Sequence, residues 1–248
     1  MGQGPPASLI RRQSASHEYR ILGKHPNSEW LYAVVLDGVL LYLALDVVAQ
    51  LLPPHYNPLS QPESDLAVGP FGYIMTINFL NRGLLSLGFL FALHRTIRDT
   101  GSASLRPRNG YLLFGAWSVG SVLLAIFPTD VPPTPVSWHG AIHLVVAVVA
   151  FLGGSFGALS LTLNFRGSGF LERVKRIVLQ VAILAVVLCL VDLITPFLAP
   201  RTAAAFGGLF ERLFLGALLF WIAAISASAL RHGIIGQQPH PVTQVSEI

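Results

Sequence analysis

Hydrophobic residues gather in six long stretches along the chain, and shorter polar segments separate these stretches. Each stretch is close to the roughly 20 residues that an α-helix needs to cross a hydrocarbon core about 30 Å thick. They lack the short alternating pattern of barrel strands, so we expect helices that satisfy their own backbone polar groups. The predicted spans are residues 30–52, 71–97, 111–127, 140–163, 174–198 and 205–230. The sequence therefore predicts an all-α, polytopic membrane protein whose residues 30–230 form one six-transmembrane-helix bundle.

The composition agrees with this prediction and excludes other classes of protein. Of the 248 residues, 53% are hydrophobic and only 11% are charged, whereas a soluble domain carries about 25% charged residues. The high share of hydrophobic residues and the low share of charged residues rule out a disordered chain and an ordinary soluble enzyme. The single cysteine, Cys189, falls within the fifth predicted span, so an internal disulfide is excluded.

Lysine and arginine residues are distributed unequally between the two sides of the predicted bundle. Most of the 16 lie in the N-terminal segment, in the connections after the second and fourth spans, and in the C-terminal tail, whereas the connections at 53–70 and 128–139 contain none. Because basic residues stay on the cytoplasmic side, we predict that both termini are cytoplasmic. The net charge of +4 then reflects this topology and an attraction to anionic lipid, and we expect no nucleic-acid partner.

The two ends of the chain carry no membrane span. Residues 1–29 are rich in Gly, Pro, Ser and charged residues, and they lack the apolar segment of a cleavable signal peptide. We predict a mobile cytoplasmic tail at residues 1–29 and a cytoplasmic C-terminal tail at residues 231–248.

Polar and ionisable residues within the spans concentrate in the half of the membrane opposite the termini. Such side chains cost several kcal/mol each in hydrocarbon, so we expect them to face other helices. At a rise of about 1.5 Å per residue, they lie about 9–16 Å from the outer helix ends. These residues are Asp46, Asn78, Arg82, Asp192, Glu211 and Arg212. We predict that they meet in one polar layer in the outer half of the bundle.

Arg82 is the most informative residue of this layer, because a guanidinium at such depth needs an acidic partner. The candidates at a similar depth are Asp46, Asp192 and Glu211. In one interpretation, ion pairs between these residues stabilise the bundle. In the other, Arg82 binds an anionic group such as a lipid phosphate or a carboxylate, assisted by Asn78 on the same helix face.

Asp37 is the exception, because it falls in the inner half of the first span. The nine residues between Asp37 and Asp46, at about 100° each, turn it to the opposite side of the helix. We interpret Asp37 as an interhelical hydrogen-bond or ion-pair residue, reached by a basic side chain from the cytoplasmic rim.

The connection after the third span contains the most specific chemical motif, FPTDVPPTPVSWHGAIH. Ser137 is placed to cap the next helix, so that His139 and His143 lie one turn apart on the same face. Two imidazoles at this spacing can bind one metal ion, and Asp130 is a candidate third ligand, a set that suits Zn²⁺. The alternative is that the two histidines are hydrogen-bonded interfacial residues, because H-x-x-x-H by itself is a weak pattern.

Several segments also resemble a known family. They are HYNPLSQPESDLAVGPFGYIMTINFLNRGLLSLG, GSVLLAIFPTD and HGAIHLVVAVVAF, with Ser64-Asp65-Leu66, Phe127-Pro128-x-Asp130 and the His139 to His143 turn as the most specific parts. Over most of residues 30–230 the chain resembles the bacterial and archaeal membrane family catalogued as domain of unknown function 998. This resemblance implies a compact helical domain in a bacterial or archaeal cytoplasmic membrane, with no agreed reaction.

A more distant likeness is to alkaline ceramidase-like intramembrane hydrolases, which also combine an Asp at a helix end with H-x-x-x-H. Those proteins have seven spans, carry the histidine pair on the last one, and have a further S-x-x-x-H. The only S-x-x-x-H here runs from Ser228 to His232, at the cytoplasmic end of the sixth span. A metal bound by His139 and His143 would therefore need Asp130 or another carboxylate of the outer layer.

Two functions from different classes fit these features. The first is a metal-dependent hydrolase that cleaves a lipid amide or ester near the outer leaflet, with Zn²⁺ at the histidine motif activating a water molecule. In this hypothesis Asp46 or Glu211 acts as the base, and Arg82 stabilises the developing oxyanion.

The second function is that of a non-catalytic lipid-binding or accessory subunit of a larger membrane complex. In this hypothesis Asn78, Asp192 and Arg212 bind a lipid or belong to an internal ion-pair network, and the partners are membrane lipids and other membrane subunits. A proton-coupled transporter fits less well, because the inner half of the membrane offers few ionisable residues beyond Asp37.

Overall fold

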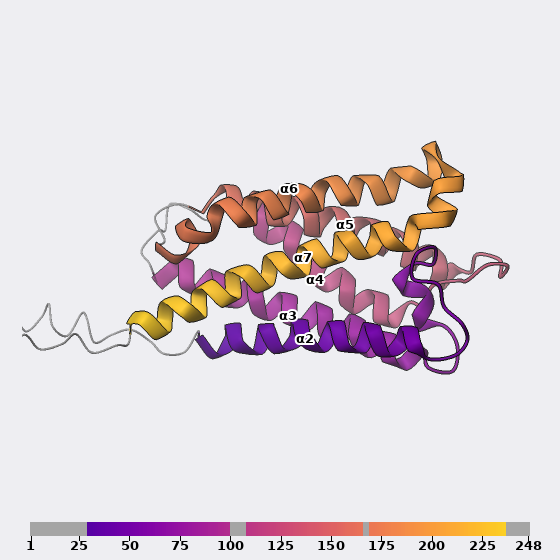
Figure 1. Ribbon diagram of the computed structural model, residues 1–248, viewed down its shortest axis with the longest axis horizontal. Helices are drawn as coiled ribbons and strands as arrows, with labels where there is room; N and C mark the ends of the chain where they lie inside the picture. The colour runs from indigo at the N-terminus through magenta and orange to yellow at the C-terminus, as the bar shows by residue number, and fades with distance from the viewer. Residues whose placement is uncertain (1–28, 100–107, 166–168, 237–248) are drawn as a thin grey trace, which may run out of the picture.

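The computed structural model describes residues 29–99, 108–165 and 169–236, which form six long α-helices and one short 3-10 helix (Figure 1). In chain order the elements are α2 (Glu29–Leu51), η1 (Glu63–Ala67), α3 (Gly72–Asp99), α4 (Arg108–Ile126), α5 (Trp138–Leu163), α6 (Gly169–Leu198) and α7 (Pro200–Gly236). All six α-helices are long and apolar enough to cross a membrane. The predicted all-α, six-helix membrane architecture is therefore confirmed. Most of the two predicted tails, residues 1–28 and 237–248, lies outside the described residues.

Helix boundaries follow local sequence signals. α7 begins at Pro200, five residues before the predicted start, and proline is favoured in the first turn because its missing N–H is not needed there. α5 begins directly after Ser137, whose hydroxyl accepts a hydrogen bond from the Gly140 N–H at 3.1 Å. The predicted cap of this helix is confirmed.

The six helices form a closed ring. Each helix packs against its neighbours in the chain, and α7 completes the ring by packing against α2. In Figure 1, α7 lies between α6 and α2, and α4 and α5 lie behind it. Within the described residues, α2 and α6 make no contact with each other. Each helix therefore keeps one face on the outside of the ring.

Two glycines allow α4 and α5 to approach closely, as their G-x-x-x-G spacing predicts. A Cβ on Gly153 would lie 2.6 Å from the Leu113 carbonyl oxygen, and a Cβ on Gly157 would lie 2.6 Å from the Phe114 backbone nitrogen. A side chain at either position would push the two helices apart.

Aromatic side chains fill the centre of the ring. The Phe89 and Trp221 ring centres are 5.2 Å apart, and those of Phe151 and Phe214 are 4.9 Å apart. Trp117 of α4 is fully buried and lies 6.2 Å from the Phe214 ring centre. These rings form an apolar core below the polar residues of the outer half.

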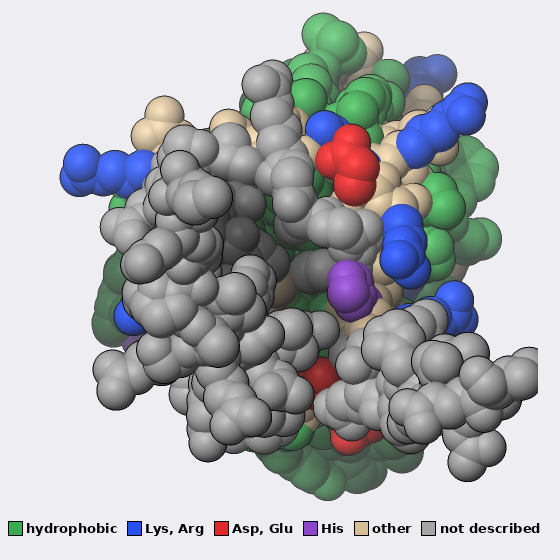
Figure 2. Space-filling view, turned by 90° about the vertical axis from the view of Figure 1, so that its left-hand side faces the viewer, with side chains coloured by type: hydrophobic (Ala, Val, Ile, Leu, Met, Phe, Trp, Pro, Cys, Tyr) green, Lys and Arg blue, Asp and Glu red, His purple; other side chains and the backbone are tan. Residues whose placement is uncertain are grey.

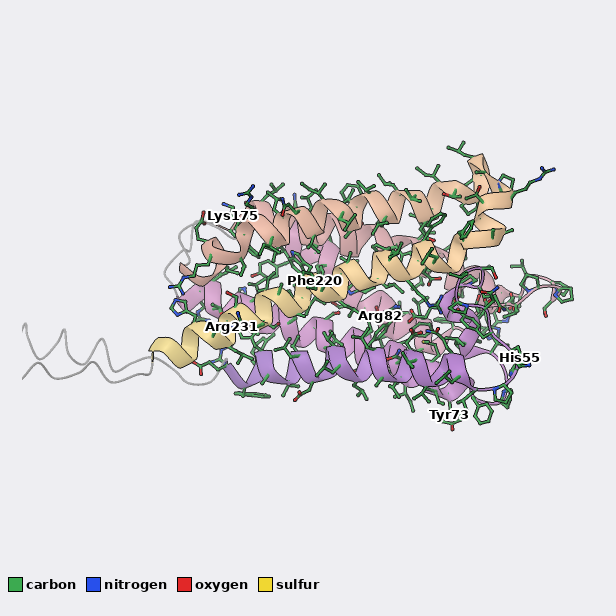
Figure 3. The ribbon with its side chains drawn as sticks, viewed as in Figure 1. His55, Tyr73, Arg82, Lys175, Phe220 and Arg231 are labelled. Carbon is green, nitrogen blue, oxygen red and sulfur yellow. The ribbon has the colours of Figure 1, made fainter. Side chains whose placement is uncertain are left out.

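Basic side chains gather at one end of the bundle. Figure 2 shows this end, with Lys and Arg side chains around its rim. Figure 3 places Lys175 and Arg231 at the same end, and His55 and Tyr73 at the opposite end. Following the positive-inside rule, we expect the end with Lys175 to face the cytoplasm, and we call the opposite end the outer end.

Candidate functional site

The connection between α2 and α3 folds back onto the outer end of the bundle, and we call residues 52–71 the outer loop. Its short helix η1 packs against α2, α3 and α7. The Tyr56 hydroxyl holds the loop together through contacts of 2.7 Å with the carbonyl oxygens of Gln61 and Pro62. This path inserts Glu63 between the helices, where it is only 1% exposed.

Glu63 is the centre of a buried polar network. The Tyr42 hydroxyl donates to the Glu63 carboxyl group, with a distance of 2.5 Å to Oε2. Arg82 Nη1 lies 3.4 Å from the same carboxyl oxygen, and the two residues form an ion pair. The same Nη1 also lies 3.3 Å from the Tyr42 hydroxyl oxygen. One carboxyl group thus joins α2, the outer loop and α3.

The Arg82 guanidinium is enclosed by protein, inside the bundle and toward its outer end (Figure 3). Its Nε donates to the Ser121 hydroxyl of α4 at 3.1 Å, and Ser121 donates in turn to the Trp117 carbonyl oxygen at 2.9 Å. The guanidinium carbon lies 4.7 Å from the Trp117 ring centre and 5.0 Å from the Phe79 ring centre. Both distances are typical of cation–π contacts. Trp117 therefore separates the charged network from the apolar core.

Glu211 of α7 binds the same turn of the outer loop. Its Oε2 accepts a hydrogen bond from the Glu63 backbone N–H at 3.0 Å. Burial raises the pKa of the Glu63 side chain to about 8; the Arg82 guanidinium opposes the shift, and the Asp46 and Glu211 carboxyl groups add to it. Glu63 therefore holds a proton more readily than an exposed glutamate does.

Arg212 fastens the outer loop to α7. Its Nη1 donates to the carbonyl oxygens of Pro58 and Gln61, both at 3.1 Å, and its Nη2 donates to the Tyr56 hydroxyl at 2.5 Å. This close approach requires Gly208, because a Cβ at that position would lie 2.2 Å from the Gln61 carbonyl oxygen. Side-chain hydrogen bonds and a close backbone approach thus hold the same segment of the loop, just before η1, against α7.

Asp46 lies at the edge of these contacts. Its Oδ2 accepts a hydrogen bond from Gln50 Nε2 at 2.6 Å, and its Oδ1 lies 3.9 Å from Arg212 Nη2. In the part of the chain that the structure describes, the buried Asp46 Oδ1 and Arg212 Nε have no hydrogen-bond partner. We call this set of side chains the outer network: Tyr42, Asp46, Glu63, Arg82, Glu211 and Arg212.

The acidic partner of Arg82 differs from the predicted candidates. The sequence suggests Asp46, Asp192 or Glu211, whereas the structure pairs Arg82 with Glu63. Sequence reasoning missed Glu63 because it considered the apolar spans, and Glu63 lies in a polar connection between two of them. The available signal was charge, since that connection contains acidic residues and no Lys or Arg, and it faces the half of the membrane that holds a buried arginine.

The remaining predicted residues of the outer layer lie less centrally. Asn78 donates from Nδ2 to the Tyr42 carbonyl oxygen at 3.1 Å, and its buried Oδ1 has no partner among the described residues. Asp192 of α6 is half-buried and close enough to Glu211 to affect it electrostatically, but no hydrogen bond or ion pair joins Asp192 to any described residue. Asp192 therefore lies at the periphery of the outer network.

Asp130, the predicted carboxylate ligand of a metal, lies in the connection between α4 and α5. Its Oδ2 accepts a hydrogen bond from the Ser137 N–H at 2.6 Å, and its Oδ1 accepts one from the Ser137 hydroxyl at 3.0 Å. A Cβ on Gly140 would lie 2.0 Å from Asp130 Oδ2. Asp130 thus orders the connection that leads into the capped start of α5.

The two predicted histidine ligands have different surroundings. His143 is buried, and its Nδ1 lies 2.7 Å from the Phe127 carbonyl oxygen. A carbonyl oxygen only accepts, so Nδ1 carries the proton. His139 is half-buried, and its ring packs against that of the preceding tryptophan. Across residues 29–99, 108–165 and 169–236, no three His, Cys, Asp or Glu side chains come together as a metal-binding group. The zinc centre stays a prediction from the sequence.

Comparison with protein families finds a match over most of the chain. A family model described as a protein of unknown function (DUF998) matches residues 37–228. The chain belongs to the DUF998 family. The match runs from α2 through most of α7 and includes every residue of the outer network, and it confirms the resemblance seen in the sequence. No curated protein and no solved structure matches the DUF998 chain. The protein is an integral, multi-pass membrane protein of a family of unknown function.

Proposed function

We propose that this DUF998 protein is a non-catalytic subunit of a membrane assembly, and that the outer network serves to hold the outer loop on the bundle. The enclosure of Arg82 carries this proposal. Arg82 is 1% exposed, and its Nε and Nη1 donate to side chains of the protein itself. A guanidinium enclosed in this way, with Nε and Nη1 bound to the protein, is not available to a lipid phosphate or to a developing oxyanion.

The contacts of Glu63 support a structural role for the network. Its side chain binds α2 through Tyr42 and α3 through Arg82, and its backbone N–H binds α7 through Glu211. A buried ion pair adds little net stability compared with a well-packed apolar pair, whereas removal of one partner leaves an uncompensated buried charge. Such a network therefore favours one position of the outer loop over all others.

The outside of the ring supports the role of a subunit. In α2 and in α6, only 22% of the most apolar 18-residue stretch of the helix is buried inside the bundle, compared with 56% in α3 and in α7. The chain by itself thus covers little of α2 and α6. Helices with such large uncovered faces are suited to contacts with other membrane helices as well as with lipid.

The lipid amide or ester hydrolase is the alternative, and it stays a prediction from the sequence. It needs Asp46 or Glu211 as a base and Arg82 next to the reacting carbonyl group. Because Glu63 covers the Arg82 guanidinium, the outer loop would have to leave the bundle before a lipid could bind there.

A double-mutant cycle combined with an activity assay tests the proposal. The full chain is reconstituted in lipid nanodiscs as the wild type, Arg82→Met, Glu63→Gln and the double variant. Glu172→Gln, at an exposed site on α6, is the matched control. We expect Arg82→Met to lower the unfolding temperature, the double variant to recover part of the loss, and the control to have no effect.

The same samples are assayed for hydrolysis of a fluorescent ceramide and of a short-chain phosphatidylcholine. We expect no turnover by the wild type. Turnover that is lost in a folded double variant would overturn the proposal in favour of the hydrolase. Gently solubilised membranes are then examined by native mass spectrometry, in which we expect particles larger than one chain; single chains alone would contradict the role of a subunit.

A further inference from the structure

Asp37 is an exposed acidic residue within a membrane-spanning helix. It lies on the outer face of α2 among exposed apolar side chains, which include Val34 (54% exposed), Leu40 (65%) and Leu41 (47%). It follows Glu29, the first residue of the span, by eight residues, which corresponds to about 12 Å along the helix axis. Among the residues that the structure describes, none forms a hydrogen bond or an ion pair with Asp37.

An unpaired carboxyl group at this depth requires an explanation. Charged side chains in hydrocarbon are costly, and they pair with other groups or face a polar cavity. Long basic side chains can reach the interface along their alkyl stems, but an aspartate side chain is too short to do so. Asp37 therefore needs a polar partner from outside the surface that this chain provides.

The outer face of α6 offers groups of complementary chemistry at a similar depth. Arg176 and Gln180 are exposed on this face, next to the exposed apolar side chains of Ile177 (53%) and Leu184 (50%). The span begins at Leu171, so Arg176 lies about 7.5 Å and Gln180 about 13.5 Å along the helix axis. These two positions bracket the depth of Asp37. Arg176 also has no ion-pair partner within residues 29–99, 108–165 and 169–236.

Asp37 and Arg176 cannot meet within one chain. α2 packs against α3 and α7, α6 packs against α5 and α7, and no contact joins α2 to α6 in the described ranges. Figure 1 shows the two helices on opposite sides of α7, both running from the basic end toward the outer end. A second copy in the same membrane orientation can bring its α6 alongside α2, with Arg176 about 4.5 Å nearer the inner end than Asp37. The long arginine side chain can span this offset.

We propose that this protein binds a second copy of itself through α2 of one copy and α6 of the next, with Asp37 paired to Arg176 between the copies. This inference deepens the proposed function, on which it rests, by naming the partner. The contact uses two different surfaces, so its repetition gives a ring if the rotation closes and an open chain if it does not. The exposed apolar residues around both charges supply the packing that surrounds the pair.

Site-directed cross-linking tests the contact. In a Cys189→Ala background, one tagged chain carries Asp37→Cys and a second, differently tagged chain carries Arg176→Cys, and both are expressed in the same membranes. A short bis-maleimide is expected to join the two chains. Leu112→Cys replaces Arg176→Cys as the matched control, because Leu112 is 63% exposed near the inner end of α4. We expect several-fold more cross-linked product with Arg176→Cys than with the control.

Charge reversal provides the second test. Asp37→Arg alone and Arg176→Asp alone are expected to reduce the recovery of one tagged copy with the other, and Asp37→Arg combined with Arg176→Asp is expected to restore it. Arg98→Asp, at an exposed position at the end of α3 and outside the proposed contact, is expected to have no effect.

Two results would overturn the inference. One is cross-linking no greater than in the control, and the other is a double charge reversal that recovers no better than the single variants. If larger particles that contain other proteins are found with either result, the second-copy contact fails and the role of a subunit survives. If the wild type hydrolyses lipid and the folded double variant of Arg82→Met and Glu63→Gln does not, the proposed function fails. A positive cross-link would still support the contact between copies.

Discussion

Glu63 Oε2 and Arg82 Nη1 lie 3.4 Å apart, and their side chains are 2% and 1% exposed, although one belongs to the outer loop and the other to the interior of α3. Neither group can reach water unless the loop moves away from the bundle. The position of the outer loop and the charge state of Glu63 are therefore coupled.

Removal of the Tyr42 hydroxyl is expected to destabilise the protein. This hydroxyl donates to Glu63 and lies 3.3 Å from Arg82 Nη1, so Tyr42→Phe leaves two buried groups with one partner fewer. We expect the free energy of unfolding to fall by about 1–3 kcal/mol, as measured by denaturant titration in mixed micelles. Tyr73→Phe, 60% exposed at the outer end, is the control and should have little effect. Equal effects of the two variants would contradict the importance of the outer network.

Stability is expected to fall as the pH rises from about 5 to 8. Burial raises the pKa of Glu63 from 4.5 to about 8, so the folded state binds more protons than the unfolded state across this interval. The free energy of unfolding then decreases with pH, by at most about 1.4 kcal/mol per pH unit from this group. Unfolding temperatures across this interval should show a shallower slope in Glu63→Gln than in the wild type. An unchanged slope would show that Glu63 does not titrate in this range.

Gly208→Ala is expected to displace the outer loop. The added Cβ would lie 2.2 Å from the Gln61 carbonyl oxygen, and this backbone cannot shift without breaking the contacts of Arg212. We expect a loss of about 1–3 kcal/mol of stability and faster amide hydrogen exchange in residues 52–71. Gly216→Ala on the same helix is the control, because a Cβ there meets nothing within 4 Å. Unchanged exchange in the Gly208 variant would contradict the close approach of the loop to α7.

Asp130→Ala is expected to destabilise the connection between α4 and α5 whether or not zinc is present. Both carboxylate oxygens accept hydrogen bonds from Ser137, so the substitution removes two contacts that need no metal. Unfolding temperatures are compared with a chelator and with added zinc, and elemental analysis follows the metal content. Asp130→Ala should lower the unfolding temperature equally under both conditions. Stabilisation by zinc in the wild type alone would instead support the metal centre that the sequence predicts.

The local parts of the fold can be read from the sequence. Each membrane helix is recognised by an uninterrupted apolar stretch, because hydrocarbon excludes unpaired backbone groups wherever the helix packs. The capping role of Ser137 and the close approach at Gly153 and Gly157 depend on spacing within one helix, so they too are confirmed. The depth of Arg82 likewise predicts that it is buried, since its distance from the helix ends follows from the helical rise.

The partners of the buried charges were decided only by the tertiary structure. The sequence predicts that Arg82 needs a carboxylate, but the pairing depends on how the outer loop returns to the bundle, and the loop brings Glu63 closer than any acid within the spans. The uncovered face that holds Asp37 likewise depends on which helices close the ring. Hydrophobicity acts on each segment by itself, whereas an ion pair needs two groups within about 4 Å, and only the complete packing of the chain sets that distance.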